Sequence, residues 1–336
     1  CFITGQKEFK QCGITDYVEL IAKELEKLGH EIERYFINQD SEELTDLPNM
    51  DLYSIQFAPY AYGNNGMPKT ILNLLTKGLC NKNVHLNFHE IWVGAYPRAN
   101  WKERGIGWLQ KNLILRFIKK CKPVCITSSN AAALDRLKQA GVPAMYLYLF
   151  GNIPHSANSK ETAKGHTLKV AFFGTHYSDF PYDKLGEFFS TLSKISGKKL
   201  EIILIGRQRE DTGSDHLCSM CKKNNFFIER TGELSTDLIS EHFQECTLGV
   251  STTPYDVIGK SGATAAMLEH DLPVLAYDDG DTPKESLFIP DLFKDQIFLI
   301  NNDSSVEKLL HYIERPRKSF FDGVAHTANK MLEIVT

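Results

Sequence analysis

Short apolar runs rich in β-branched and aromatic residues recur along the 336-residue chain, and stretches with helical periodicity separate them. Runs of this length suit strands that are covered on both faces, so their alternation with helices predicts parallel sheets joined by crossover helices, an α/β fold. The runs are residues 1–4, 32–37, 52–57, 84–88, 124–127 and 145–149 in the first half, and residues 169–173, 201–205, 226–229, 248–251, 273–277 and 297–300 in the second half.

The chain length favours two domains, because 336 residues exceed one ordinary core and suit two cores of roughly 150 residues each. Residues 156–167 have almost no apolar content, which is typical of a solvated linker. We therefore predict one domain over residues 1–155 and a second over residues 168–315. The tail, residues 316–336, has a helical pattern and is predicted to pack back on the first domain.

Composition excludes several classes of protein. A net charge of -4 gives no basic field for a phosphate backbone, so we expect no nucleic acid partner. No apolar run approaches the roughly 20 residues of a membrane-spanning helix, and no signal-peptide pattern is present. A cytoplasmic protein is expected, and exposed Trp101, Lys102 and Arg104 leave a peripheral membrane contact open.

The eight cysteines are spaced irregularly, which favours free thiols in a reducing compartment. The pair Cys218 and Cys221 has zinc-ligand spacing but no second pair nearby. We therefore predict no metal site.

Ligands of an open parallel sheet bind beyond the carboxyl ends of its strands, so the residues after each run are the candidates. Lys260 and Ser261 lie between Gly259 and Gly262 and open a predicted helix. The amides of a helix start with a lysine beside them hold phosphate oxygens. A serine N-cap beside a solvated lysine is an equal alternative.

Two further anion signals follow strands of the same predicted sheet. Gly174 and Thr175 come after residues 169–173, where a residue without Cβ lets the backbone approach a phosphate. Arg207 follows residues 201–205, and its guanidinium suits phosphate or carboxylate oxygens, although a surface charge is an alternative.

In the first domain His89 and Glu90 follow residues 84–88. These groups can hydrogen-bond hydroxyl groups or move a proton, whereas a purely structural role is the alternative for a lone histidine at a strand end. The segments around Gly13 and around Tyr62 and Gly63 follow other strands of the same edge. They form either an acceptor pocket or simple turns.

In their order and spacing these segments resemble bacterial glycosyltransferases of the GT-B fold, in particular the retaining glycosyltransferase family 4, with members in polysaccharide biosynthesis. The resemblance spans nearly the whole chain and implies two Rossmann-like parallel-sheet domains facing across a cleft. It is carried by Cys12–Tyr17, Phe88–Trp92, Thr127–Asn130, Phe172–Thr175, Thr231–Ser235, Lys260–Gly262 and Leu272–Val274.

The resemblance implies a nucleotide-diphosphate sugar as co-substrate, held mainly by the second domain, and no separate cofactor. The implied catalytic residues are His89, Glu90 and Lys260. The implied diphosphate site comprises Gly13, Gly174, Thr175, Arg207, Lys260, Ser261 and Gly262. The implied nucleobase and ribose site comprises Gly232, Glu233, Leu234 and Glu269, and the implied acceptor side comprises Asp16, Tyr62 and Gly63.

The implied reaction moves a hexose or related sugar to a saccharide or other hydroxyl acceptor with retention and without metal. The family has two glutamates separated by seven residues, but the aligned positions here are Ile258 and Ala266. Glu269 lies one helical turn later. The family's arginine and lysine after the first strand of the second domain are also missing, and our hypothesis is that Lys260 supplies that charge.

Two alternatives stay open. A sugar-nucleotide epimerase on the same fold uses water or an internal base in place of an acceptor. A non-catalytic subunit that binds nucleotide sugars also fits, because the glutamate pair is missing.

Overall fold

The computed structural model describes residues 1–5, 13–63, 66–94, 99–157, 166–207, 211–280, 291–302 and 305–335. The chain divides into two compact units. The first unit comprises Cys1–Tyr148 together with Val324–Thr336, and the second comprises Leu149–Gly323. The units divide at Tyr148, before the predicted boundary at residue 155, and most of the predicted linker lies outside the described residues.

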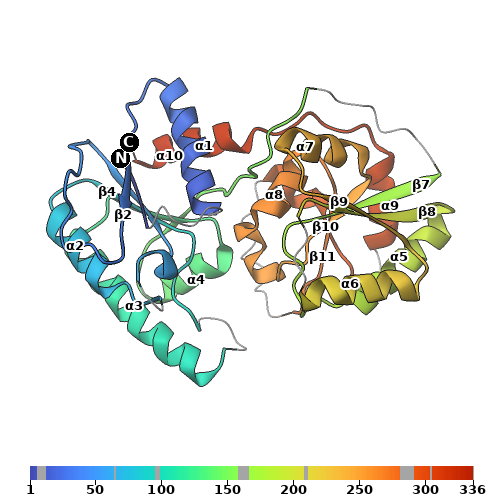
Figure 1. Cartoon of the computed structure of the whole chain (residues 1–336), viewed down its shortest axis with the longest axis horizontal. Helices are drawn as coiled ribbons and strands as arrows, with labels where there is room; N and C mark the ends of the chain where they lie inside the picture. The colour runs from blue at the N-terminus through green and yellow to red at the C-terminus, as the bar shows by residue number, and fades with distance from the viewer. Residues whose placement is uncertain are drawn as a thin grey trace. The chain divides into compact units, whose positions relative to one another are not determined.

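The first unit is built on a six-stranded parallel sheet in the order β2-β1-β3-β4-β5-β6. Its strands are β1 Phe2–Gly5, β2 Arg34–Ile37, β3 Tyr53–Phe57, β4 Val84–Phe88, β5 Cys125–Ser128 and β6 Met145–Tyr146. Its helices are α1 Gly13–Lys27, η1 Pro59–Ala61, α2 Lys69–Leu79, α3 Trp101–Cys121, α4 Ala131–Gln139 and α10 Gly323–Val335. Helices lie on both faces of the sheet (Figure 1).

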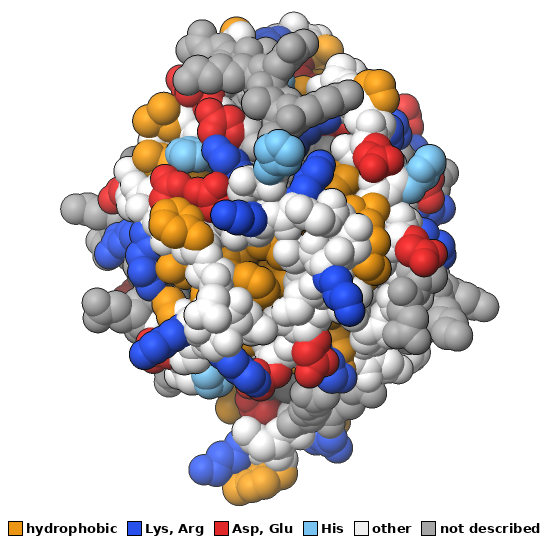
Figure 2. Space-filling view, turned by 90° about the vertical axis from the view of Figure 1, so that its right-hand side faces the viewer, with side chains coloured by type: hydrophobic (Ala, Val, Ile, Leu, Met, Phe, Trp, Pro, Cys, Tyr) orange, Lys and Arg blue, Asp and Glu red, His pale blue; other side chains and the backbone are white. Residues whose placement is uncertain are grey.

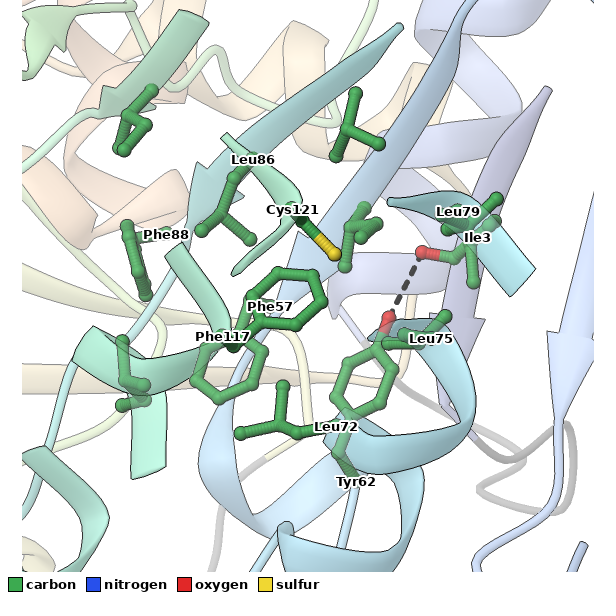
Figure 3. Packing of buried hydrophobic residues seen from close by; sticks show 14 of the residues in the cluster. Ile3, Phe57, Tyr62, Leu72, Leu75, Leu79, Leu86, Phe88, Phe117 and Cys121 are labelled. Carbon is green, nitrogen blue, oxygen red and sulfur yellow. Dashed lines mark hydrogen bonds between the residues drawn. The ribbon is translucent and has the colours of Figure 1, made fainter. Parts of the chain in front are cut away.

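Local sequence explains where these elements begin and what they bury. Every residue of β3 and β4 is buried, as expected for central parallel strands. Helix α3 begins with a capping box, in which the Asn100 side chain accepts from the Glu103 amide and the Glu103 carboxylate accepts from the Asn100 amide. The sheet and helices enclose an apolar core that includes Phe57, Leu75 and Phe117 (Figure 3).

The second unit has a six-stranded parallel sheet in the order β12-β11-β10-β7-β8-β9. Its strands are β7 Thr167–Phe173, β8 Lys199–Ile205, β9 Phe227–Gly232, β10 Leu248–Val250, β11 Val274–Ala276 and β12 Ile297–Leu299. Its helices are α5 Tyr182–Ser196, α6 Thr212–Lys223, α7 Thr236–Glu245, η3 Tyr255–Lys260, α8 Gly262–Glu269, η4 Asp291–Gln296 and α9 Ser305–Glu314. The sheet is covered on both faces (Figure 1).

The predicted α/β class with two parallel sheets is confirmed. Each unit buries its own hydrophobic cluster between its sheet and its helices. In the second unit the centre of this cluster is formed by Val170, Phe172, Phe189 and Leu204. The two cores are therefore separate clusters, one in each unit.

Three observations bear on membrane, metal and redox chemistry. Across the residues described above, no helix combines the length and the apolarity needed to cross a bilayer. Within that same part of the chain, no His, Cys, Asp and Glu side chains gather in the groups of three that a metal ion needs. Seven cysteines are described and all are free thiols, including Cys218 and Cys221.

Candidate functional site

The carboxyl edge of the second sheet contains a topological switch point. β7 and β10 are neighbours, but the chain leaves β7 toward β8 and leaves β10 toward β11, so the two connections run to opposite sides. Diverging connections open a crevice beyond the strand ends, which is where open α/β sheets bind ligands. Gly174 follows β7, and the segment that leads into α8 follows β10.

Gly174 lies against the first turn of α8. Its φ of +92° is a left-handed value, and a Cβ added there would stand 2.7 Å from the Ala263 Cβ. Both facts require a residue without a side chain. The glycine turn and the first turn of α8 are therefore adjacent. Ala263 comes three residues after Lys260 in the sequence.

The start of α8 is held by a short hydroxyl network. Ser261 caps the helix, because its Oγ accepts from the Thr264 amide at 3.2 Å. The Thr264 Oγ1 donates to the Ser261 Oγ at 2.9 Å and lies 2.7 Å from the Ser251 Oγ at the end of β10. The earlier amides of a first turn, here Gly262 and Ala263, have no intrahelical acceptor, so this end attracts anions.

The turns after β7 and β10 are tied together by Thr252. Its Oγ1 donates to the Thr175 carbonyl at 2.8 Å and accepts from the Tyr177 amide at 3.1 Å. Sequence reasoning missed Thr252, although the Ser-Thr-Thr run at residues 251–253 directly after a strand was a signal. The Thr175 side chain and Lys260 are both exposed.

A second corner of this edge joins the ends of β8 and β9. Gly206 forms a bridge to Gly232, and its amide donates to the Thr231 Oγ1 at 3.0 Å. Arg207 is exposed next to this bridge, as is Glu233. The structure thus brings Arg207 beside the residues predicted for the nucleobase, Gly232 to Leu234.

Glu269 does not belong to this edge, and the prediction that it binds ribose is corrected. It lies eight residues after Ser261, about 12 Å along the helix axis. Its side chain is 2% exposed, and its Oε1 accepts from the Gly151 amide at 2.9 Å. The sequence could not show this because the partner is 118 residues away.

A cavity of about 410 Å³ lies at that far end of α8, lined by Leu268, Glu269, Asp271, Phe293, Gln296, Lys318, Ser319, Phe320 and Phe321. Asp271 on its wall pairs with Arg315 at 2.6 Å. The other predicted donor residues do not line this cavity, so it is separate from the switch point.

Replacing Gly174 with alanine should destabilise the second unit by about 1–3 kcal/mol, because the new Cβ meets Ala263 and the backbone is held at positive φ. The control is Gly197→Ala, since Gly197 has a φ of +67° with nothing within 4 Å of the added Cβ. The protection of β7 peptides against hydrogen exchange should fall more in Gly174→Ala than in Gly197→Ala. Equal losses would mean that the contact with α8 is not tight.

In the first unit His89 is attached to a buried ring of polar side chains on three neighbouring strands. The Gln56 Nε2 donates to the Ser54 Oγ at 2.7 Å, and the Asn87 Nδ2 donates to the Gln56 Oε1 at 2.9 Å. The Thr127 Oγ1 donates to the Asn87 Oδ1 at 2.9 Å. His85 closes the ring, with 2.9 Å from its Nδ1 to Ser54 and 2.8 Å from its Nε2 to Thr127.

The ring fixes the proton positions of both histidines. Thr127 gives its one proton to Asn87, so the Nε2 of His85 must donate to Thr127 and its Nδ1 accepts from Ser54. The His89 Nε2 lies 2.9 Å from the Gln56 Oε1, a carbonyl oxygen that only accepts. The Nε2 of His89 therefore carries the proton, and its Nδ1 is left as an acceptor.

Burial lowers the pKa of His89 to about 4, and burial followed by repulsion from His89 lowers the pKa of His85 to about 4. Both imidazoles are neutral near pH 7, which agrees with the ring, since an added proton on His85 would face the Ser54 hydroxyl. The sequence signal for this ring was the alternation of polar residues at 54 and 56 and at 85 and 87, which sequence reasoning missed.

The other predicted residues of the first unit fall into two groups. Gly13 and Asp16 are exposed in the first turn of α1, and Glu90 is exposed directly after β4. Tyr17 of the same helix packs edge-on against His89, with 5.0 Å between ring centroids. Asp16 thus lies next in sequence to a residue that contacts His89.

Tyr62 and Gly63 are buried, and their predicted place on the acceptor side is corrected. The Tyr62 side chain is 1% exposed, stacks on Phe57 and donates from its hydroxyl to the Ile3 carbonyl at 2.9 Å (Figure 3). A Cβ on Gly63 would stand 2.2 Å from the Met67 carbonyl oxygen. Both residues pack the interior, because the chain turns back tightly after β3.

The variant Thr127→Val should destabilise the first unit by about 1–3 kcal/mol, because it leaves the His85 N–H and the Asn87 oxygen buried without partners. Urea unfolding followed by tryptophan fluorescence measures this unit alone, since Trp92, Trp101 and Trp108 are the three tryptophans of the chain.

The matched control is Thr4→Val on β1 of the same sheet. The Thr4 hydroxyl is buried and has no hydrogen-bond partner within the described ranges, so its loss should be neutral or stabilising. Equal destabilisation by the two variants would contradict the ring.

A histidine NMR titration should find His85 and His89 uncharged down to about pH 5, each with the proton on Nε2. Their folded pKa values lie below the usual 6.5. The unfolded chain therefore binds these protons first, and the free energy of unfolding should fall as the pH is lowered from 6.5 toward 4. Titration of either ring near pH 6.5 would contradict its burial.

No protein-family model matches the chain, and a search among curated proteins finds no match. Solved structures do resemble it. An alpha-glucosyltransferase (AGT) in complex with UDP aligns with a TM-score of 0.54 at 11% identity, covering 99% of this chain and 94% of that chain. A protein assigned as a UDP-N-acetylglucosamine 2-epimerase from Listeria monocytogenes aligns with a TM-score of 0.53 at 10% identity, covering 98% and 94%.

The chain has the GT-B fold. The structure of TarM also aligns, at 18% identity and a TM-score of 0.49, covering 84% of this chain and 51% of that chain. The chain thus spans about half the length of TarM. At these identities the likeness concerns the fold alone, which hosts more than one reaction.

Proposed function

We propose that the protein transfers a sugar from a nucleotide-diphosphate donor to a saccharide or other hydroxyl-bearing acceptor. One observation carries the proposal: the Gly174 turn meets the first turn of α8 at the switch point between β7 and β10. A diphosphate needs closely approached backbone amides and a positive helix end, and this corner offers both.

Each donor group has a proposed partner on the described edge of the second sheet. The amides of Gly262 and Ala263 face the diphosphate, with Lys260 beside them. Arg207 and Thr175 contact further phosphate oxygens. The nucleobase lies against Gly232 to Leu234, at the corner where β8 and β9 end.

Stabilisation of the departing diphosphate is the main catalytic effect in this proposal. The charge that develops on the leaving oxygen meets the amides of α8 and the ammonium group of Lys260. We propose retention without a metal, with the departing phosphate oxygen taking the acceptor proton. The bond from the sugar to the diphosphate breaks as the bond to the acceptor oxygen forms on the same face.

The first unit has its own set of proposed ligand contacts. His89 is neutral, and its Nδ1 accepts a hydrogen bond from a sugar hydroxyl while Gln56 holds its Nε2–H. Glu90, Asp16 and Gly13 are exposed in the same unit and are the further residues proposed to contact a ligand there. The likeness to a glucosyltransferase in complex with UDP supports a uridine nucleotide as the first donor to test.

The variant Lys260→Ala should lower turnover by about 10²–10³, as expected when one preorganised cationic partner of the leaving group is lost. The control is Lys199→Ala, because Lys199 is exposed at the amino end of β8, the opposite edge of the same sheet. Steady-state kinetics of sugar transfer measure both. Unchanged turnover in a folded Lys260→Ala variant would remove this residue from the mechanism.

An epimerase is the second candidate, because the Listeria protein aligns over nearly its whole length. Incubation of the nucleotide sugar without acceptor distinguishes the two reactions. An epimerase converts the donor to a stereoisomer, whereas a transferase leaves it intact or hydrolyses it slowly.

A thermal-shift screen of UDP, GDP, ADP and TDP sugars should identify the donor, since a ligand at 100 times its Kd raises the free energy of unfolding by about 2.7 kcal/mol. No stabilisation by any of them would contradict both candidates.

A further inference from the structure

Helix α3 of the first unit exposes large apolar side chains that are not packed in the hydrophobic core. Trp101 is 78% exposed, Trp108 is 65% exposed and Leu109 is 46% exposed. The buried residues of the helix lie on its opposite side, at Gly107, Gln110, Ile114, Phe117 and Cys121. The helix is therefore anchored by one face and presents tryptophans on the other.

The buried face is fixed tightly, so the places of the exposed tryptophans on the helix are defined. The Gln110 side chain accepts from the Val93 amide at 2.8 Å and donates to the Gly66 carbonyl at 2.7 Å. A Cβ on Gly107 would stand 1.9 Å from the Val93 oxygen. Trp101 and Trp108 are seven residues apart, which places them on one side of the helix about 10 Å apart along its axis.

The same segment concentrates positive charge in a chain whose net charge is -4. Between positions 101 and 122 the sequence holds seven basic residues, Lys102, Arg104, Lys111, Arg116, Lys119, Lys120 and Lys122, and one acidic residue, Glu103. The Glu103 carboxylate is used in the cap of the helix. By contrast, Lys, Arg, Asp and Glu side chains are interspersed over the face of the molecule in Figure 2.

We propose that the outer face of α3 docks on an anionic lipid surface. Tryptophan side chains settle at the interface between headgroups and acyl chains, and lysine and arginine beside them contact anionic headgroups. The exposed face of a single helix is convex, whereas a saccharide or nucleotide site is concave, which favours a lipid surface over a soluble anionic polymer. This surface is independent of the proposed sugar transfer.

The test is flotation of the full chain with vesicles of phosphatidylcholine alone and with 30% phosphatidylglycerol. The wild type should bind the anionic vesicles and should dissociate at high salt, because the lysine and arginine contacts are screened. Trp101→Ala combined with Trp108→Ala should lower binding at least tenfold. Replacing Arg116, Lys119 and Lys120 with glutamine should lower it by about fivefold for each cation removed.

The matched control is Ile195→Ala combined with Phe227→Ala, because both side chains are exposed in the second unit, at 55% and 62%. This variant should bind vesicles like the wild type. Thermal unfolding should be unchanged in all variants, since the altered side chains are exposed and their loss removes little packing.

Three results would overturn the proposal. The first is that the wild type does not bind anionic vesicles. The second is that the double tryptophan variant binds them as well as the wild type, and the third is that the protein binds soluble heparin through Trp101 and Trp108 but does not bind the vesicles. The last result would assign the surface to an anionic saccharide. All three readouts are physical binding, so they are separate from any failure of sugar transfer.

Discussion

The approach of the Gly174 backbone to Ala263 is the contact on which the candidate donor site depends. It exists because β7 and β10 are hydrogen-bonded neighbours whose connections leave in opposite directions. The Ser261 cap and its partners Thr264 and Ser251 then orient the first turn of α8 toward the same edge. The proposed phosphate site at this corner therefore depends on topology and helix capping.

In the first unit a buried polar ring holds His89 neutral and in one tautomer at the end of β4. The ring formed by Ser54, Gln56, His85, Asn87 and Thr127 satisfies every one of its members inside the sheet. A buried network that is fully paired stiffens its surroundings, whereas a partly paired one destabilises them. His89 takes its orientation from this ring through Gln56.

Much of the fold could be predicted from the sequence, because strand runs and helix caps are local signals. The proximity of Gly174 to the segment that opens α8 could be predicted for the same reason, since strand ends meet at one edge of a parallel sheet. Glu269 and Tyr62 were misjudged because their partners, Gly151 and Ile3, are distant in sequence. The polar ring was missed because its members come from three strands, and a single polar residue on one strand does not indicate a hydrogen-bonded network.

Backbone amide NMR with a nucleoside diphosphate tests the central claim most directly. UDP, and then GDP, ADP and TDP, should shift the amide signals of Gly174, Gly262 and Ala263 most, and the matching monophosphate should shift them much less. The account would be contradicted if a diphosphate binds and shifts amides at the far end of α8, around Leu268 and Asp271, while those three signals stay unchanged.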